Sequence, residues 1–267
     1  MSQRILKYRT VLFYSFAFTI SWLSWFLMSR VYLGGQPNMI VYVFSTIGGL
    51  GPLISLAILE RLSQKSITLK QVFSQIKIRG AKKAWFVLPI LALPVITVLG
   101  DIVYFVMGRE EGFRLIKSGP DTLGILVIPV MVVHFTASLI TSPLFEEPGW
   151  RGFALADLQR KYGREVGSLV VGILWWAWHQ PMNLTFGLQP TVYSFVSMVA
   201  LSFMIDSLFN LSDKNLFTAM LAHQSSGTVI MFLYQGDENP IQLGLLIGFV
   251  ILLRFRERSR TASLSPA

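Results

Sequence analysis

Long apolar stretches separated by short polar segments dominate the pattern along the chain, and strict apolar/polar alternation, which indicates β-strands, is absent. A helix needs about 20 apolar residues to cross a hydrocarbon layer roughly 30 Å thick. Only helices or closed barrels satisfy all their backbone hydrogen bonds there. The pattern therefore predicts an all-α, polytopic membrane protein with about eight transmembrane helices. The predicted spans are residues 11–32, 39–59, 85–107, 123–145, 166–186, 191–209, 216–234 and 241–253.

The composition agrees with a membrane location. Hydrophobic residues make up 53% of the 267 residues and charged residues 14%, against about 25% charged residues in soluble domains. The first apolar stretch is long and no small-residue cleavage site follows it, so we expect it to be retained rather than removed as a signal peptide. The chain has no cysteine, which fits a bacterial-type membrane protein without disulfide bonds.

Lysine and arginine residues are unevenly divided between the two sides of the predicted spans. With the N-terminus in the cytoplasm, nineteen of them fall on the cytoplasmic side and four on the opposite side. Basic loops favour the cytoplasmic side of a membrane, so this distribution supports eight spans with both termini cytoplasmic. The four cations on the opposite side are Arg30, Arg109, Arg114 and Lys117.

The net charge of +9 does not require a nucleic-acid partner, because cytoplasmic basic loops and attraction to anionic headgroups account for it. Membrane lipids are the expected partner instead. Residues 60–84 alternate loosely between apolar and basic residues, which fits an amphipathic helix on the membrane surface or a solvated basic loop. We expect residues 1–267 to form a single integral membrane domain with a short disordered tail, 261–267.

Ionisable side chains within hydrocarbon are costly and are usually functional. All three histidines, His134, His179 and His223, lie in apolar stretches, as do Asp101 and Asp206. His134 has mostly apolar neighbours, so a structural histidine hydrogen-bonded to a neighbouring helix is the better interpretation. Asp101 could pair with a buried donor and Asp206 could pair across helices.

The segment FEEPGWRGFAL, residues 145–155, places two adjacent carboxylates at the end of the fourth span. Glu147 and Arg151 are four residues apart and can form an ion pair on a helix. Glu146 then points about 100° away and has no partner nearby in the sequence, which leaves it available as a general base. Pro148 disfavours helix at Glu147 and predicts a kink there. The alternative is an ordinary cytoplasmic helix start with acidic first residues.

Two histidines in later spans could act together with Glu146. His179 follows Trp175 by one helical turn, which places the indole beside the imidazole. His223 lies among small residues that permit close helix packing, and packing alone could explain them. Two histidines on separate helices are weak evidence for a site.

The depths of these residues constrain the architecture. His179 lies thirteen residues into its predicted span, about 20 Å from the cytoplasmic start of that span, whereas Glu146 is at the end of its own span. We therefore expect residues 146–151 to lie inside the bundle as irregular backbone that lines a water-filled cavity open to the cytoplasm.

In order along the chain, EExxxR from Glu146 to Arg151, Trp175 with His179, and the later His223 resemble the motifs of the CPBP family of intramembrane proteases. This family contains the type II CAAX prenyl endopeptidases and the bacterial "Abi" proteins of bacteriocin processing and immunity. EEPGWRGF is similar to the first motif of bacterial members, and the resemblance covers about residues 123–235. It implies an integral protein of the bacterial cytoplasmic (inner) membrane.

The resemblance also implies an activity, the hydrolysis of a peptide bond in a cytoplasm-facing cavity. Glu146 would activate water, His179 would hold the water or share in proton transfer, and His223 would stabilise the oxyanion. Glu147 and Arg151 would hold the first motif in place. A peptide or a lipidated protein is the expected substrate.

Metal dependence stays open at this point. Members of the family have been described both as metalloproteases and as glutamate-dependent enzymes without a metal. Glu146, His179 and His223 could ligate zinc and leave an open position for water.

Two positions depart from the family pattern. Trp175 stands where the second motif usually has Phe, and Gly227 stands where the third motif usually has Asn or Asp. The second change removes one oxyanion-hole donor or water ligand, for which Ser226 or Asn183 could substitute. A catalytically inactive member that acts as a binding or immunity scaffold is therefore the alternative function. A proton-coupled transporter is disfavoured, because the chain shows no repeated pair of broken helices.

Overall fold

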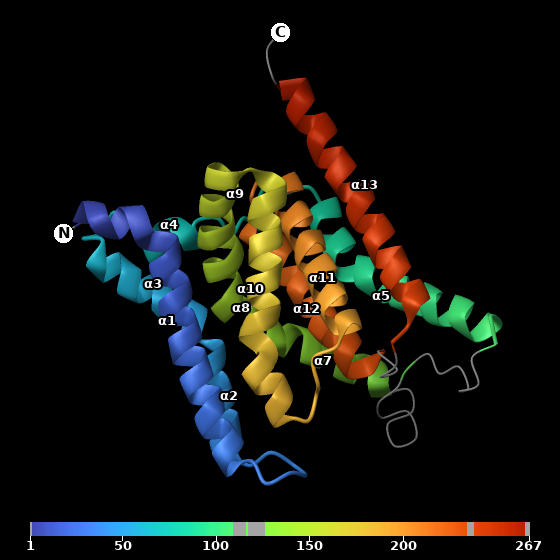
Figure 1. Ribbon diagram of the computed structural model, residues 1–267. Helices are drawn as coiled ribbons and strands as arrows, with labels where there is room; N and C mark the ends of the chain where they lie inside the picture. The colour runs from blue at the N-terminus through green and yellow to red at the C-terminus, as the bar shows by residue number, and fades with distance from the viewer. Residues whose placement is uncertain (1, 109–115, 117–125, 234–237, 265–267) are drawn as a thin grey trace. The chain divides into compact units, whose positions relative to one another are not determined.

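A computed structural model describes residues 2–108, 116, 126–233 and 238–264, and all regular secondary structure within these ranges is helical (Figure 1). The chain divides into two compact units. Unit 1 comprises Met1–Ile76 and Leu144–Ser202, and unit 2 comprises Lys77–Pro143 and Phe203–Ala267. The expectation of a single membrane domain stays a prediction.

Unit 1 begins with a long helix, α1 (Ser2–Val31), against which the next two helices pack. A π-helical segment and the helices on either side of it form the second part of the unit, and α10 contacts α1 as well. The elements after α1 are α2 (Met39–Gly49), α3 (Gly51–Leu62), α4 (Leu69–Phe73), α8 (Ser142–Glu147), η2 (Pro148–Leu155), α9 (Ala156–Tyr162), α10 (Arg164–Thr185) and α11 (Val192–Leu211), of which α8 and α11 each continue across a unit boundary.

Small residues bring α1, α2 and α3 close together. Ser21 Oγ donates to the Gly48 carbonyl at 2.6 Å, and Ser55 Oγ donates to the Phe13 carbonyl at 2.8 Å. A Cβ added at Gly51 would clash with Ser21 and lie 2.9 Å from the Ala17 carbonyl oxygen. Helices in membranes associate through such close backbone approaches and interhelical hydrogen bonds, so small side chains are required at this crossing.

Unit 2 is built around α5 (Ala84–Val106), which packs against α12 (Leu216–Phe232) and α13 (Pro240–Leu264), while α7 (Val127–Leu139) packs against α12. The buried Asp101 accepts a hydrogen bond from Asn239 Nδ2 at 2.9 Å. Asn239 in turn accepts from the backbone N–H groups of Ile241 and Gln242 at the start of α13. The expectation that Asp101 pairs with a buried donor is confirmed.

Within the described residues, four helices are long and apolar enough to cross a membrane, and a bent pair with an angle of 46° could provide a fifth span. These helices match five of the eight predicted spans and support an integral, polytopic membrane protein. The predicted spans 166–186, 216–234 and 241–253 coincide largely with α10, α12 and α13. These three helices do not count as candidate membrane spans. Helix α12 has only 17 residues, and α10 and α13 contain more polar residues than the candidate spans. The candidates are Ile5–Val31, Ala84–Val106, Val127–Tyr162, Val192–Leu211 and the bent pair Met39–Gly49 with Gly51–Leu62.

Two smaller expectations can be compared with the helices. Within residues 60–84, the five-residue helix α4 lies between the end of α3 and the start of α5, with a capping box formed by Thr68 and Gln71. The segment is therefore not one continuous amphipathic helix. Helix α13 runs to Leu264, so the first part of the expected tail is helical, and residues 265–267 lie outside the described ranges. Arg109, Arg114 and Lys117 also lie outside them.

Two neighbouring glycines test the close packing in unit 1. We expect Gly51→Ala to destabilise the protein by about 1–3 kcal/mol, because the added methyl group overpacks the crossing of α1 and α3. Gly49→Ala is the matched control, since nothing lies within 4 Å of a Cβ at that position. Thermal unfolding of both variants in detergent checks this, and equal melting temperatures would contradict the assigned packing.

Candidate active site

The two adjacent carboxylates end α8, and the chain continues directly into η2, a π-helical segment that begins at Pro148. Glu147 keeps helical backbone angles, φ −62° and ψ −33°, so the predicted departure from helix at this residue is wrong. Proline lacks an N–H and its ring crowds the carbonyl of the preceding turn. The wider π-helical turn at this point lets the helix continue past Pro148. Such turns occur frequently at functional sites.

Glu146 is buried, with 4% of its surface exposed. Trp175 Nε1, from α10, donates a hydrogen bond to Glu146 Oε2 at 3.1 Å. A carboxylate in this position is not part of a solvated helix start, which disfavours the alternative interpretation of the FEEPGWRGFAL segment. The sequence indicated that Trp175 lies beside His179 but not that its N–H reaches Glu146.

Glu147 and Arg151 form the predicted ion pair, with 3.0 Å between Arg151 Nη1 and Glu147 Oε1 and with both side chains fully buried. Arg151 Nη2 also donates to Ser202 Oγ at 2.8 Å, and its guanidinium lies 4.8 Å from the centre of the Trp175 ring. The arginine thus joins η2 to α10 and α11 through three kinds of contact. Ser202 was not predicted, because nothing distinguishes it in the sequence from the other serines of its span.

His179 is held by its own helix. Its Nδ1 lies 2.7 Å from the Trp175 carbonyl oxygen, and a carbonyl only accepts, so Nδ1 carries the proton in this hydrogen bond. In the neutral ring Nε2 is then the basic nitrogen. Trp175 and Trp178 pack edge-on against the imidazole at 5.2 and 4.8 Å, which fixes its orientation.

Asn183 lies one turn after His179 and is half-buried near the end of α10. Its carbonyl accepts a hydrogen bond from the Phe186 N–H at 3.1 Å. Its suggested role as a substitute donor stays a prediction.

His223, in unit 2, is a buried residue of α12. Its Nε2 lies 3.5 Å from Ser142 Oγ, a contact that the sequence did not indicate. Ser226 Oγ donates to the His223 carbonyl at 2.6 Å, so this hydroxyl proton is used on its own helix. A Cβ at Gly227 would meet nothing closer than Gln224 Nε2 at 3.9 Å, so the position has room for a Cβ atom.

His134 in α7 packs edge-on against Phe232 of α12, with 5.3 Å between the ring centres. Its buried Nδ1 has no hydrogen-bond partner within the described ranges. The interpretation of His134 as a structural residue is therefore supported by its ring contact with Phe232. The predicted hydrogen bond from its Nδ1 to a neighbouring helix is not found within the described residues. Asp206 is a buried residue of α11. Its expected pairing across helices stays a prediction.

In unit 1, Glu146, Glu147, Arg151, Trp175 and His179 form a connected set through the contacts above. As for a metal, no group of three or more His, Asp or Glu side chains in the part of the chain that the structure describes is arranged to hold an ion. The zinc site considered at Glu146, His179 and His223 stays a prediction, because His223 belongs to unit 2 and the other two residues belong to unit 1.

Residues 127–228 match the family described as type II CAAX prenyl endopeptidase Rce1-like, and this range contains every candidate site residue. Over these residues the chain is similar to this protease family, and the predicted resemblance over about residues 123–235 is confirmed. The curated "CAAX prenyl protease 2" of Methanococcus maripaludis is 25% identical over 180 residues, which is 66% of this chain and 63% of that relative. The chain therefore matches less than two thirds of that relative's length.

The buried ion pair between Glu147 and Arg151 should contribute mainly to stability. Glu147→Gln leaves the Arg151 charge buried without its carboxylate, so we expect a loss of about 3–5 kcal/mol in the free energy of unfolding. Arg160→Gln is the control, because the Arg160 side chain is 68% exposed in its pair with Asp157. Protein yield and thermal unfolding in detergent measure both effects. A Glu147→Gln protein as stable as the wild type but inactive would assign catalysis to Glu147 instead.

Proposed function

We propose that the protein is an intramembrane endopeptidase that hydrolyses a peptide bond with a water molecule activated by Glu146. The observation that carries the proposal is the buried Glu146 carboxylate, which accepts the Trp175 N–H within the range matched by the protease family. A carboxylate removed from bulk solvent and held in one orientation is suited to act as a general base.

In the proposed reaction, the Glu146 carboxylate takes a proton from water while the Trp175 N–H holds its Oε2. The water oxygen attacks the carbonyl carbon of the substrate, and His223 donates to the oxyanion that forms. The C–N bond then breaks as the proton from Glu146 passes to the leaving nitrogen. His179 Nε2 accepts a hydrogen bond from the attacking water, an orientation supported by the Nδ1 contact with the Trp175 carbonyl.

The same proposal includes the finer topology. Helices α10, α12 and α13 would add three spans to the bent pair and the four candidate helices, which makes eight with both termini in the cytoplasm. The 17 residues of α12 extend about 25 Å at 1.5 Å per residue, slightly less than a typical hydrocarbon layer. The cavity would face the cytoplasm of a bacterial-type inner membrane and accept a peptide or a lipidated protein.

Glu146→Gln tests the proposed base. It keeps the shape of the side chain and removes its basicity, so kcat should fall by about 10²–10⁴-fold. Glu165→Gln, an exposed position in α10, is the control and should leave activity unchanged. Mass spectrometry of a prenylated peptide library incubated with the detergent-purified proteins provides the measurement.

Two results of this experiment would count against the proposal. Equal cleavage by the wild type and Glu146→Gln would rule out Glu146 as the base. A folded wild type that cleaves no peptide would favour the inactive scaffold, for which the replacement of the usual Asn or Asp by Gly227 is the supporting observation.

Trp175→Phe tests whether the indole N–H positions the base. Phenylalanine keeps the aromatic face under Arg151 but removes the donor to Glu146. The loss of one hydrogen bond to a charged group should lower kcat about tenfold or more and leave KM nearly unchanged. Trp176→Phe is the matched control, because Trp176 packs on Phe195 instead. Equal kcat values for the two variants would show that the Trp175 hydrogen bond plays no part in catalysis.

A further inference from the structure

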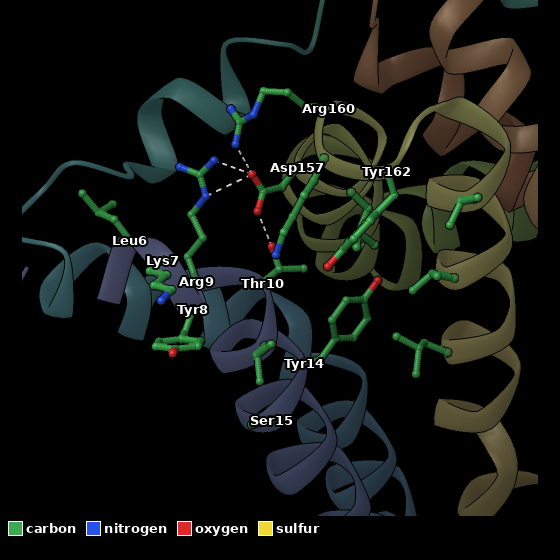
Figure 2. A pocket seen from close by; sticks show the side chains of 16 residues that line it. Leu6, Lys7, Tyr8, Arg9, Thr10, Tyr14, Ser15, Asp157, Arg160 and Tyr162 are labelled. Carbon is green, nitrogen blue, oxygen red and sulfur yellow. Dashed lines mark hydrogen bonds and ion pairs between the residues drawn. The ribbon is translucent and has the colours of Figure 1, made fainter. Parts of the chain in front are cut away.

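Unit 1 contains a cavity of about 860 Å³ that none of the proposed catalytic residues line. The first turns of α1, the helix α9 and the first part of α10 enclose it (Figure 2). Its lining is strongly divided between charged and apolar side chains, and this division indicates the kind of molecule that the cavity would accept.

Positive charge is in excess at one part of the lining. Lys7, Arg9, Arg160 and Lys161 contribute four cations, and Asp157 is the single carboxylate. That carboxylate is already neutralised, because Arg9 Nε donates to Asp157 Oδ1 at 3.1 Å and Arg160 and Thr10 also bond to it. Figure 2 shows these three side chains converging on Asp157. The cavity therefore carries a net charge of about +3 that its own residues do not balance.

The two lysines are the cations available to a ligand. Within the described ranges neither Lys7 nor Lys161 forms an ion pair, and each amino group lies over the ring of the tyrosine that follows it, at 5.4 Å for Tyr8 and 5.0 Å for Tyr162. An ammonium group has three N–H donors and its contact with an aromatic face does not use all of them, so both lysines can bind an anion without breaking the Asp157 contacts.

The opposite part of the lining is apolar. Val166, Val170 and Leu174 follow one another at a spacing of four residues on α10 and form a stripe along one face of the helix. The stripe extends about 12 Å at 1.5 Å per residue. Tyr14 and Tyr162 also line the cavity, and their hydroxyl groups point toward one another in Figure 2. Tyrosine is enriched where a polar and an apolar environment meet.

The cavity also lies near the start of a candidate membrane span, where a spanning helix would meet lipid headgroups. The candidate span of α1 runs from Ile5 to Val31, and the cavity is lined by Leu6 to Ser15 near the start of that span. The stripe on α10 continues from the charged part along the length of the helix. A free inorganic anion would use only the charged part, whereas a phospholipid would fill both.

We propose that this cavity binds an anionic phospholipid, with its phosphate at Lys7 and Lys161 beside the Asp157 contacts and an acyl chain along Val166, Val170 and Leu174. The lysine ammonium groups would neutralise the negative headgroup, and the apolar stripe on α10 would bury the acyl chain. The proposal is independent of the catalytic residues, since it concerns a site that a non-catalytic member of the fold would also possess.

The test compares lipids on the purified full-length chain in a neutral detergent. Thermal unfolding is followed while phosphatidylglycerol with long chains, phosphatidylglycerol with six-carbon chains, phosphatidylcholine with long chains, or inorganic phosphate is added, and native mass spectrometry counts the retained lipid. We expect long-chain phosphatidylglycerol to bind most tightly and to raise the melting temperature. Phosphatidylcholine and inorganic phosphate should have little effect.

Two sets of variants complete the test. The double variant Lys7→Gln with Lys161→Gln leaves the Asp157 ion pairs intact. It should weaken phosphatidylglycerol binding about 10–30-fold, because each lysine contributes about 1 kcal/mol of attraction to an anionic lipid. Lys82→Gln with Lys83→Gln is the matched control, because these exposed lysines lie at the start of another candidate span. Val170→Asn should weaken binding of the long-chain lipid but not that of the six-carbon lipid.

Three results would overturn the proposal. One is equal affinity for phosphatidylglycerol and phosphatidylcholine. Another is equal lipid binding by the two double-lysine variants. The third is stabilisation by inorganic phosphate that matches that of the long-chain lipid and is unaffected by Val170→Asn, which would identify a free phosphate as the ligand.

Discussion

The ion pair between Glu147 and Arg151 is the interaction on which the rest of the candidate site depends. Both side chains are fully buried, and a guanidinium does not lose its proton in a protein. The surrounding helices must therefore supply acceptors for it. Glu147, Ser202 and the face of Trp175 do so from α8, α11 and α10. This requirement fixes the position of Trp175, whose N–H then holds Glu146.

Two adjacent glutamates thus have different surroundings in the same helix. Glu147 is neutralised by a full positive charge, whereas Glu146 accepts an N–H from a neutral indole. Neighbouring residues on a helix point about 100° apart, so each reaches different partners. The difference separates a carboxylate that stabilises the fold from one suited to react with water.

Charge compensation recurs throughout both units. In unit 1, Asp157 binds Arg9, Arg160 and Thr10, and this contact ties α9 to α1 beside the lysine-rich cavity. In unit 2, Arg254 and Glu257 form a buried pair with 2.9 Å between Arg254 Nη1 and Glu257 Oε2, and the guanidinium packs over Phe203. Charges near hydrocarbon are retained where a partner offsets the loss of water. The unbalanced positive charge at Lys7 and Lys161 differs from this pattern, and a lipid phosphate would provide the missing partner.

The sequence by itself determined the helical class, the positions of most helices, the ion pair from Glu147 to Arg151 and the placement of Trp175 beside His179. All of these follow from the spacing of residues along one helix, which the helical period sets locally. The four or five candidate spans of the described residues support part of its eight-span prediction, and it wrongly predicted that Pro148 would take Glu147 out of the helix. Only the tertiary structure decided the contacts of Ser202 with Arg151, of Ser142 with His223 and of the Trp175 indole with Glu146. Such contacts depend on how each helix is rotated against its neighbours, and that rotation results from packing over the whole unit rather than from any local spacing of residues.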